Sequence, residues 1–318
     1  MRVLIVGSAG QDGRILWGQL QEQGDELIGI TRRDVQSLRD SPRPAVDIFC
    51  ECAVRRLVED FAPERVYFLA AHHHSSEDRG SREGEIWNSS WRTHVDAFRN
   101  FLEAIRVTGL PARIFYASSS RVFGNPDFSP QNEDTPVRPI CLYGITKATG
   151  MMLARHYRET HGVWASCGIL YNHESPRRGR QFLSQRVAHG LVALKEGRET
   201  KLEIGNLEAR VDWGYAPDYT RAMRLIVEAA PAGDYVIASG STHSVREMIE
   251  VAGDFLEFPW HGAVVENPAV LQRPALALWG DASRLQATTG WRPTQTFEDL
   301  VRIMVNAALE FTLKRCPV

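Results

Sequence analysis

Three glycines at three-residue spacing open the chain, between a short apolar run and a helical pattern. The apolar run is 3–6, the glycines are Gly7, Gly10 and Gly13, and apolar residues recur at helical spacing over 14–23. Glycine permits a tight turn here and lets backbone N–H groups approach a pyrophosphate at the positive end of the helix. The pattern predicts a strand, a phosphate-binding loop and a helix. A glycine-rich turn without a ligand is the alternative.

Apolar runs continue to alternate with helical patterns along the first half of the chain. Further strands are predicted at 26–30, 65–70, 113–117 and 164–170, and a helix at 95–106. Several runs are almost wholly apolar, as expected of strands that are buried on both faces. This alternation is typical of an α/β fold with a Rossmann-type, doubly wound parallel sheet.

The pattern becomes less regular after residue 171. Segment 172–180 is polar and basic and carries Pro176 and Gly179, so it predicts a loop and not a sheet element. Helices are expected at 182–196, 218–230 and 244–256, and an extended segment at 264–279. We expect residues 1–171 to form a nucleotide-binding domain and 172–318 to form most of a smaller substrate-binding lobe. A later strand near 211–240 is expected to return to the sheet.

Composition narrows the class of protein. The chain has 318 residues, of which 43% are hydrophobic and 24% charged, as in an ordinary globular protein. A net charge of -2 gives no basic field for nucleic acid, and no apolar stretch approaches the roughly 20 residues of a membrane helix. The N-terminal segment does not have the layout of a signal peptide, and the five cysteines do not have the spacing of a zinc site. Both observations predict reduced thiols in a cytoplasmic protein. Cys50 and Cys52 are too close in sequence for an easy bridge.

The end of the second predicted strand bears on the choice of dinucleotide. The strand leads into Thr31, Arg32 and Arg33, where an NAD site usually has an acidic residue that binds the ribose 2′-OH. Two arginines suit a 2′-phosphate, so they favour NADP, although NAD stays possible. A solvated basic turn is the alternative. Asp47 is a candidate acceptor for the adenine amino group.

A serine run and a Tyr-x-x-x-Lys pair supply the candidate catalytic groups. Ser119 follows a predicted buried strand, and Tyr143 and Lys147 come one short loop later. Four-residue spacing on a helix places the last two side chains on one face, where the ammonium is expected to lower the pKa of the phenol. The three groups predict hydride transfer at a carbinol carbon, with Tyr143 exchanging the proton. Tyr143 and Lys147 are also candidate cofactor-binding residues, and Lys147 is a candidate partner of the nicotinamide ribose. The alternative is a surface Tyr and Lys on an amphipathic helix.

Several segments together resemble one family. They are Gly10-Gln11-Asp12-Gly13, Arg32-Arg33, 143–147, 171–179, 205–209, 212–214 and Gly290-Trp291. The chain resembles the extended short-chain dehydrogenases/reductases that modify nucleotide sugars, and among them most of all the GDP-mannose 4,6-dehydratase family. The run Asn-His-Glu-Ser-Pro-Arg-Arg at 172–178 is far more specific than the glycine loop. The resemblance implies a bound nicotinamide nucleotide and a nucleoside-diphosphate hexose, here a GDP-linked one.

The resemblance also assigns roles to individual residues. It implies that Gln11, Asp12 and Ala70 contact the cofactor and that Ser120 and Asn172 contact the substrate. The diphosphate of the substrate is expected at two arginines. Arg273, before a proline, matches one of them; Arg210 lies one residue before the position of the other, which is Val211 here.

Two further departures concern the chemistry. The family's dehydration step uses a glutamate two residues after the catalytic Ser or Thr, and that position is Arg121. A guanidinium is no general base at neutral pH, so Arg121 is expected to bind substrate or stabilise charge. The run of three histidines at 72–74 invites a metal hypothesis, but adjacent side chains do not converge on one ion and no partner ligands are spaced for it. No metal site is predicted.

Three functions stay open from the sequence. The first is NADP-dependent modification of a GDP-hexose at C4 in the manner of a 4,6-dehydratase. The second is a 4-keto-sugar reductase or a 4-epimerase, for which Ser119, Tyr143 and Lys147 suffice. The third is a catalytically weakened, nucleotide-binding relative with a regulatory role. The resemblance further implies a homodimer, formed by the helices that follow residues 93 and 143. A homotetramer is implied if the Arg177-Arg178 loop reaches a neighbouring subunit.

Overall fold

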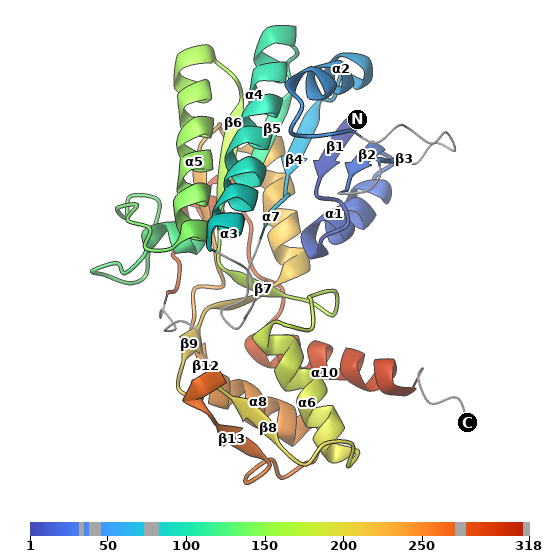
Figure 1. The fold of residues 1–318 in the computed structure, drawn as a ribbon, viewed down its shortest axis with the longest axis vertical. Helices are drawn as coiled ribbons and strands as arrows, with labels where there is room; N and C mark the ends of the chain where they lie inside the picture. The colour runs from blue at the N-terminus through green and yellow to red at the C-terminus, as the bar shows by residue number, and fades with distance from the viewer. Residues whose placement is uncertain (32–34, 38–45, 73–82, 271–277, 314–318) are drawn as a thin grey trace.

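The structure is a computed structural model that describes residues 1–31, 35–37, 46–72, 83–270 and 278–313. It has an α/β part built on one sheet and a second lobe, which lies below that sheet in Figure 1. In the described part of the chain, no helix has both the length and the apolar character needed to span a membrane.

The sheet is a Rossmann-type parallel sheet, as predicted. Its order is β11-β6-β5-β4-β1-β2-β3, and only the edge strand β3 runs antiparallel to its neighbour. The strands are β1 (Arg2–Val6), β2 (Glu26–Ile30), β3 (Val35–Ser37), β4 (Arg65–Phe68), β5 (Arg113–Ala117), β6 (Ala165–Leu170) and β11 (Asp234–Ile237). Since parallel strands end at one edge, the segments after β1, β4 and β5 meet there.

Helices cover both faces of this sheet, which explains the apolar strands. α2 (Glu51–Phe61) packs on α4 (Ala97–Thr108), and α4 packs on α5 (Leu142–His161); α1 (Gln11–Gln21) packs on α7 (Ala216–Ala229). α3 (Glu83–Trp91) runs into α4 through a π-helical turn. Aromatic side chains fill the interior between them, with the Phe98 and Tyr116 ring centroids 4.3 Å apart. Fully buried aromatics of this size dominate the burial energy of a core.

The second lobe has a hydrophobic core of its own. It is built from α6 (Leu183–Lys195), α8 (Val245–Phe255) and α10 (Phe297–Leu313), together with the short pairs β8 (Leu202–Ile204) with β13 (Val264–Glu266) and β9 (Arg210–Val211) with β12 (His243–Ser244). Between these elements the chain returns to the sheet: α7, β11 and α9 (Ser283–Thr289) pack on the first core. Residues after 171 therefore contribute to both cores, and β11 lies within 211–240, where a strand that returns to the sheet is expected from the sequence.

One predicted loop contains a strand instead. Residues 172–174 form β7 (Asn172–Glu174), which pairs in parallel with β10 (Trp213–Tyr215) between the two cores. The expectation of a loop without sheet structure over 172–180 is wrong for these three residues. Their polar sequence gave no strand signal, because His173 and Glu174 are buried against polar partners and not against apolar ones.

Candidate active site

The phosphate loop lies between β1 and α1, as predicted. Gly7 has a φ of +95°, and its N–H donates to the Ile30 carbonyl oxygen at 2.8 Å. A side chain on Gly7 would come within 2.8 Å of the backbone nitrogen of Ala70, which follows β4. Gly10 is the N-cap of α1 and provides no capping side chain. This is a cradle of backbone N–H groups at a helix N-terminus, which is suited to a diphosphate.

Gly13 is the position in this loop where a side chain is least tolerated. A Cβ there would overlap the carbonyl oxygen of Gly7 and the backbone of Ser8, which cannot rotate away. We predict that Gly13→Ala weakens dinucleotide binding by about 5- to 150-fold, the equivalent of about 1–3 kcal/mol of overpacking. Fluorescence titration measures the effect. Gly18→Ala is the control, because no atom lies within 4 Å of a Cβ at that helical position; a matching loss there would contradict the prediction.

Asp12, the second residue of α1, forms an ion pair with a residue far along the chain. Its Oδ2 lies 3.0 Å from Nε2 of His173, and their side chains are 20% and 9% exposed. Nδ1 of His173 lies 2.7 Å from the Tyr171 carbonyl oxygen, which can only accept, so Nδ1 carries a proton. Burial alone would lower the pKa of His173, but the Asp12 carboxylate outweighs it and raises that pKa. Burial alone would raise the pKa of Asp12, but His173 and Arg178 lower it.

Gln11 makes further contacts between the start of α1 and the segment that contains His173. Its Nε2 donates to the carbonyl oxygen of His173 at 3.1 Å, and its Oε1 accepts from Ser175 Oγ at 2.9 Å. Side chains at the end of the phosphate loop are thus hydrogen-bonded to β7 and to Ser175 directly after it, and this segment leads into the second lobe. The sequence placed Gln11 and Asp12 at the cofactor but did not indicate this link, since 161 residues separate Asp12 from His173.

The three candidate catalytic residues lie around the end of β5 and the start of α5. Ser119 is 9% exposed, and its Oγ accepts from the N–H of Arg121 at 3.2 Å. Lys147 is 1% exposed, and its Nζ donates to the carbonyl oxygen of Ala117 at 2.8 Å and lies 5.7 Å from the Tyr143 ring centroid. A Cβ on Gly144 would meet the Arg121 carbonyl, so the start of α5 packs directly on the serine segment. The structure brings all three to one place.

The pKa of Tyr143 moves opposite to the expected direction. Burial raises it to about 12, and the charges of Arg178 and Arg121 offset this only in part. Burial also lowers the pKa of Lys147 to about 7. The expected lowering of the phenol pKa is therefore wrong, because desolvation penalises the phenolate and reduces the charge on the neighbouring amine as well. Tyr143 keeps its proton at neutral pH and is suited to donating it.

His94 is a buried residue behind Tyr143 that the sequence analysis missed. It lies in the π-helical turn Arg92–Asp96, is 0% exposed, and its ring meets the Tyr143 ring edge-on at 5.3 Å. Its Nε2 accepts from the His72 N–H at 2.9 Å, so Nδ1 carries the proton and donates to Thr146 Oγ1 at 2.8 Å. This imidazole links the segment after β4 to the helix that carries Tyr143 and Lys147. A lone His in a helical pattern gave no signal of it.

The remaining cofactor candidates lie at the same end of the sheet or outside the described residues. Asp47 is exposed, and its Oδ1 accepts from the N–H of Phe49 at 2.9 Å. Ala70 is half-buried beside Gly7. Arg32 and Arg33 lie outside the described residues.

The candidate substrate residues fall into two groups. Ser120 is buried, Asn172 is exposed at the start of β7, and Arg121 is half-buried beside Tyr143. The Arg121 guanidinium makes no hydrogen bond or ion pair with any described residue. The Arg210 side chain binds residues of the second lobe. Its guanidinium donates to Oγ1 of Thr242 at 3.1 Å and to the carbonyl oxygen of Thr242 at 2.6 Å, and it forms an ion pair with Glu247 at 3.1 Å. Arg273 lies outside the described residues.

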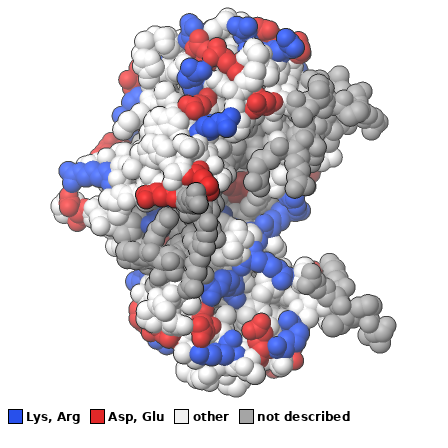
Figure 2. Space-filling view, in the orientation of Figure 1, with Lys and Arg blue, Asp and Glu red and all other residues white. Residues whose placement is uncertain are grey.

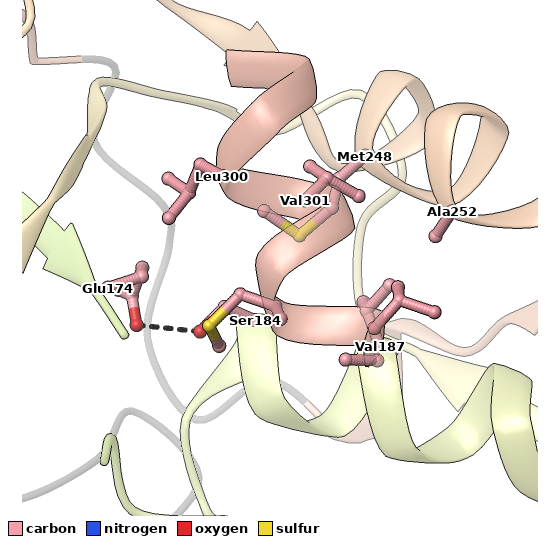
Figure 3. Close-up of a pocket in the computed structure, with 10 residues that line it drawn as sticks. Glu174, Ser184, Val187, Met248, Ala252, Leu300 and Val301 are labelled. Atoms are coloured by element: carbon pink, nitrogen blue, oxygen red, sulfur yellow. Dashed lines mark hydrogen bonds between the residues drawn. The ribbon is translucent and has the colours of Figure 1, made fainter. Parts of the chain in front are cut away.

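The distribution of charge on the surface fits a site between the two parts. Figure 2 shows Lys and Arg side chains gathered on this face where the α/β part meets the second lobe. The small pocket in Figure 3 is a different feature. Apolar side chains of α6, α8 and α10 line it together with Glu174 and Ser184, and its volume of about 10 Å³ is too small for a ligand. No cluster of three metal-ligating side chains occurs among the described residues; of the three histidines, only His72 is described.

A Rossmann-type sheet with a glycine phosphate loop and a Ser, Tyr and Lys at one edge defines a short-chain dehydrogenase/reductase. The family model described as GDP-mannose 4,6 dehydratase matches residues 4–304. GDP-mannose 4,6 dehydratase 2 of Arabidopsis thaliana is 34% identical over 96% of this chain and 86% of its own length. The GDP-mannose 4,6 dehydratase of Homo sapiens is 30% identical over 96% of this chain and 91% of its own length. The chain belongs to the GDP-mannose 4,6-dehydratase family.

Solved structures agree on the fold. RMD from Pseudomonas aeruginosa, complexed with NADPH, matches with a TM-score of 0.81 and 22% identity, over 97% of this chain and 99% of that one. The UDP-glucose 4-epimerase of Thermus thermophilus, in complex with NAD, matches with a TM-score of 0.80 and 22% identity over the same shares. At this identity the likeness concerns the fold alone.

Proposed function

We propose that this protein catalyses nicotinamide-dependent hydride transfer at C4 of a nucleoside-diphosphate hexose, without the water loss of a 4,6-dehydratase. The single observation that carries the proposal is the pairing of a protonated Tyr143 with a cation, Arg121, where the family has its glutamate base. A phenol with a pKa of about 12 supplies a proton to an oxygen that becomes an alkoxide. Nothing at position 121 removes a proton from carbon.

The cofactor we propose is NADP, which supplies or accepts the hydride when bound. The close-packed glycines of the phosphate loop fit its diphosphate, Asp47 suits the adenine amino group, and Arg32 and Arg33 suit a 2′-phosphate. Both NADPH and NAD occur in the similar structures. We propose that Lys147 binds the nicotinamide ribose; in support, its Nζ lies at the end of β5, where it donates to the Ala117 carbonyl oxygen.

The substrate we propose is GDP-linked, after the curated relatives, which are GDP-mannose 4,6-dehydratases. Ser119 would donate to the oxygen on C4, and Tyr143 would exchange the proton with it. The Arg121 guanidinium, which has no hydrogen-bond partner among the described residues, would bind a negative or polar group of the sugar. For Arg210 to reach the diphosphate, it would have to exchange its bonds to Thr242 and Glu247. We further propose a homodimer through α4 and α5.

Mass spectrometry of the sugar nucleotide tests the reaction type. We expect GDP-mannose with NADP to show no loss of water, and a GDP-linked 4-keto hexose with NADPH to gain two hydrogen atoms while the nicotinamide is oxidised. A GDP-mannose product lighter by one water would overturn the proposal. A cofactor whose redox state never changes would instead favour a regulatory, nucleotide-binding role.

Restoring a carboxylate at position 121 tests why water loss is absent. We predict that Arg121→Glu produces a detectable product lighter by one water from GDP-mannose, because a carboxylate beside Tyr143 can act as the missing base. Arg121→Gln is the matched control, since it removes the cation without adding a base. Water loss by both variants would show that the base lies elsewhere. No water loss by Arg121→Glu would show that more of the site differs from the family.

A further inference from the structure

Two cysteines face each other at the start of α2. Cys50 is the N-cap of that helix and Cys52 lies in its first turn; their Sγ atoms are 3.0 Å apart, and one thiol donates its hydrogen to the other sulfur. Cys52 is exposed and Cys50 half-buried. Neither has a role in the site described above. The other described cysteines differ: Cys167 is buried in β6, and Cys141 caps α5.

We propose that Cys50 and Cys52 form a redox-active dithiol that reacts with low-molecular-weight disulfides of the glutathione type and closes to a disulfide. The atoms need to move little, since the 3.0 Å separation must shorten to about 2.05 Å. A bridge across one residue is strained, and strained, exposed disulfides are the readily reduced, regulatory ones. The same strain disfavours formation of the disulfide and makes its reduction easier, so the reaction is reversible.

The local chemistry suits thiol–disulfide exchange. The hydrogen bond from Cys52 lowers the pKa of Cys50, which also lies at the positive end of a helix. The Cys50 thiolate attacks one sulfur of the disulfide and releases one thiolate. The Cys52 thiolate then attacks Cys50 Sγ and releases the second. Two electrons pass from the dithiol to the small disulfide, and the two cysteine protons end on the two released thiols.

Formation of the Cys50–Cys52 disulfide would change the position of Asp47, the proposed adenine-binding residue. The N–H of Cys50 donates to the carbonyl oxygen of Asp47 at 3.0 Å, so one turn connects them. That turn is fixed at its centre, because Asn100 Nδ2 donates to the Ile48 carbonyl at 3.0 Å and the Arg92 guanidinium lies 4.3 Å from the Phe49 ring centroid. Because these contacts hold Ile48 and Phe49 in place, a displacement of Cys50 reaches Asp47 through the hydrogen bond from the Cys50 N–H. This step rests on the proposed function; the disulfide itself does not.

Peptide mass spectrometry of the full-length protein tests the site. After equilibration with oxidised and reduced glutathione, the peptide with both cysteines is expected to lose two hydrogen atoms and to regain them with dithiothreitol. Cys52→Ser is expected to stop at a glutathione adduct on Cys50, and buried Cys167 is the internal control. A wild-type peptide that stays a dithiol, or keeps a stable adduct, at all glutathione ratios would overturn the proposal.

A titration with NADP tests the link to Asp47 separately. Oxidised protein is expected to bind about tenfold more weakly than reduced protein, the effect of losing one hydrogen bond to a charged group. The double variant Cys50→Ser with Cys52→Ser is expected to show no response to glutathione. Equal affinity in a protein that mass spectrometry shows to be oxidised would overturn this link alone. A protein that binds no NADP in either state contradicts the proposed function and leaves the disulfide result unaffected.

Discussion

Tyr143→Phe is expected to slow hydride transfer by about 10²- to 10⁴-fold, the range for removing a general acid. Only the hydroxyl is lost, and burial keeps that hydroxyl protonated, with its pKa raised to about 12. Reduction of a 4-keto sugar then has no proton donor at C4. At most one hydrogen bond to the bound cofactor is lost with this hydroxyl, so the Kd of the dinucleotide should rise by no more than about tenfold. Single-turnover oxidation of NADPH measures the rate, and fluorescence titration measures the Kd.

The matched control lies on the same helix. Tyr157 is buried near the C-terminal end of α5, whereas Tyr143 is the second residue of that helix, and the Tyr157 hydroxyl donates to Glu103 Oε2 at 3.0 Å. Tyr157→Phe costs about 1 kcal/mol of stability through that hydrogen bond and should leave the rate unchanged. A Tyr143→Phe protein that keeps the wild-type rate would assign proton donation to another group, and His94 would be the first candidate because its ring contacts Tyr143.

The sheet and the catalytic segment could be predicted because their signals are local. The apolar run before Gly7 and the helical spacing after Gly13 specify a strand, a loop and a helix within a short window. Tyr143 and Lys147 lie on one helix, so their spacing alone places them together. The edge at which parallel strands end then gathers the segments after β1, β4 and β5.

The missed features depend on contacts between distant segments. β7 has no apolar alternation because its buried polar residues have polar partners elsewhere in the chain, such as Glu174 with Ser184. The direction of the Tyr143 pKa shift follows from burial, which depends on the whole site and not on a four-residue spacing. His94 acts through hydrogen bonds to His72 and Thr146, which lie on different elements. No local pattern marks such residues.

The Asp12–His173 ion pair should make stability depend on pH in two opposite ways. The pKa of His173 is raised above its ordinary 6.5, so its contribution is complete below pH 6.5 and is lost as pH rises through the raised value. The pKa of Asp12 is lowered below its ordinary 3.8, so its contribution is complete above pH 3.8 and is lost as pH falls through the lowered value. The pair therefore contributes fully between these two ordinary values.

Replacing His173 tests how much the ion pair contributes to stability and in which direction that contribution changes with pH. His173→Ala is expected to cost about 3 kcal/mol in the free energy of unfolding at pH 6, the lower end for a broken buried pair, because the Asp12 side chain keeps 20% exposure. His173→Gln keeps a donor for Asp12 but does not titrate, so its deficit relative to wild type should shrink as pH rises above 6.5. Urea unfolding across pH measures both. The control is His156→Gln, an exposed histidine of α5. A deficit for His173→Gln that grows with rising pH would show that His173 is neutral in the folded protein and that Asp12 has a different counter-charge, with Arg178 the nearest alternative.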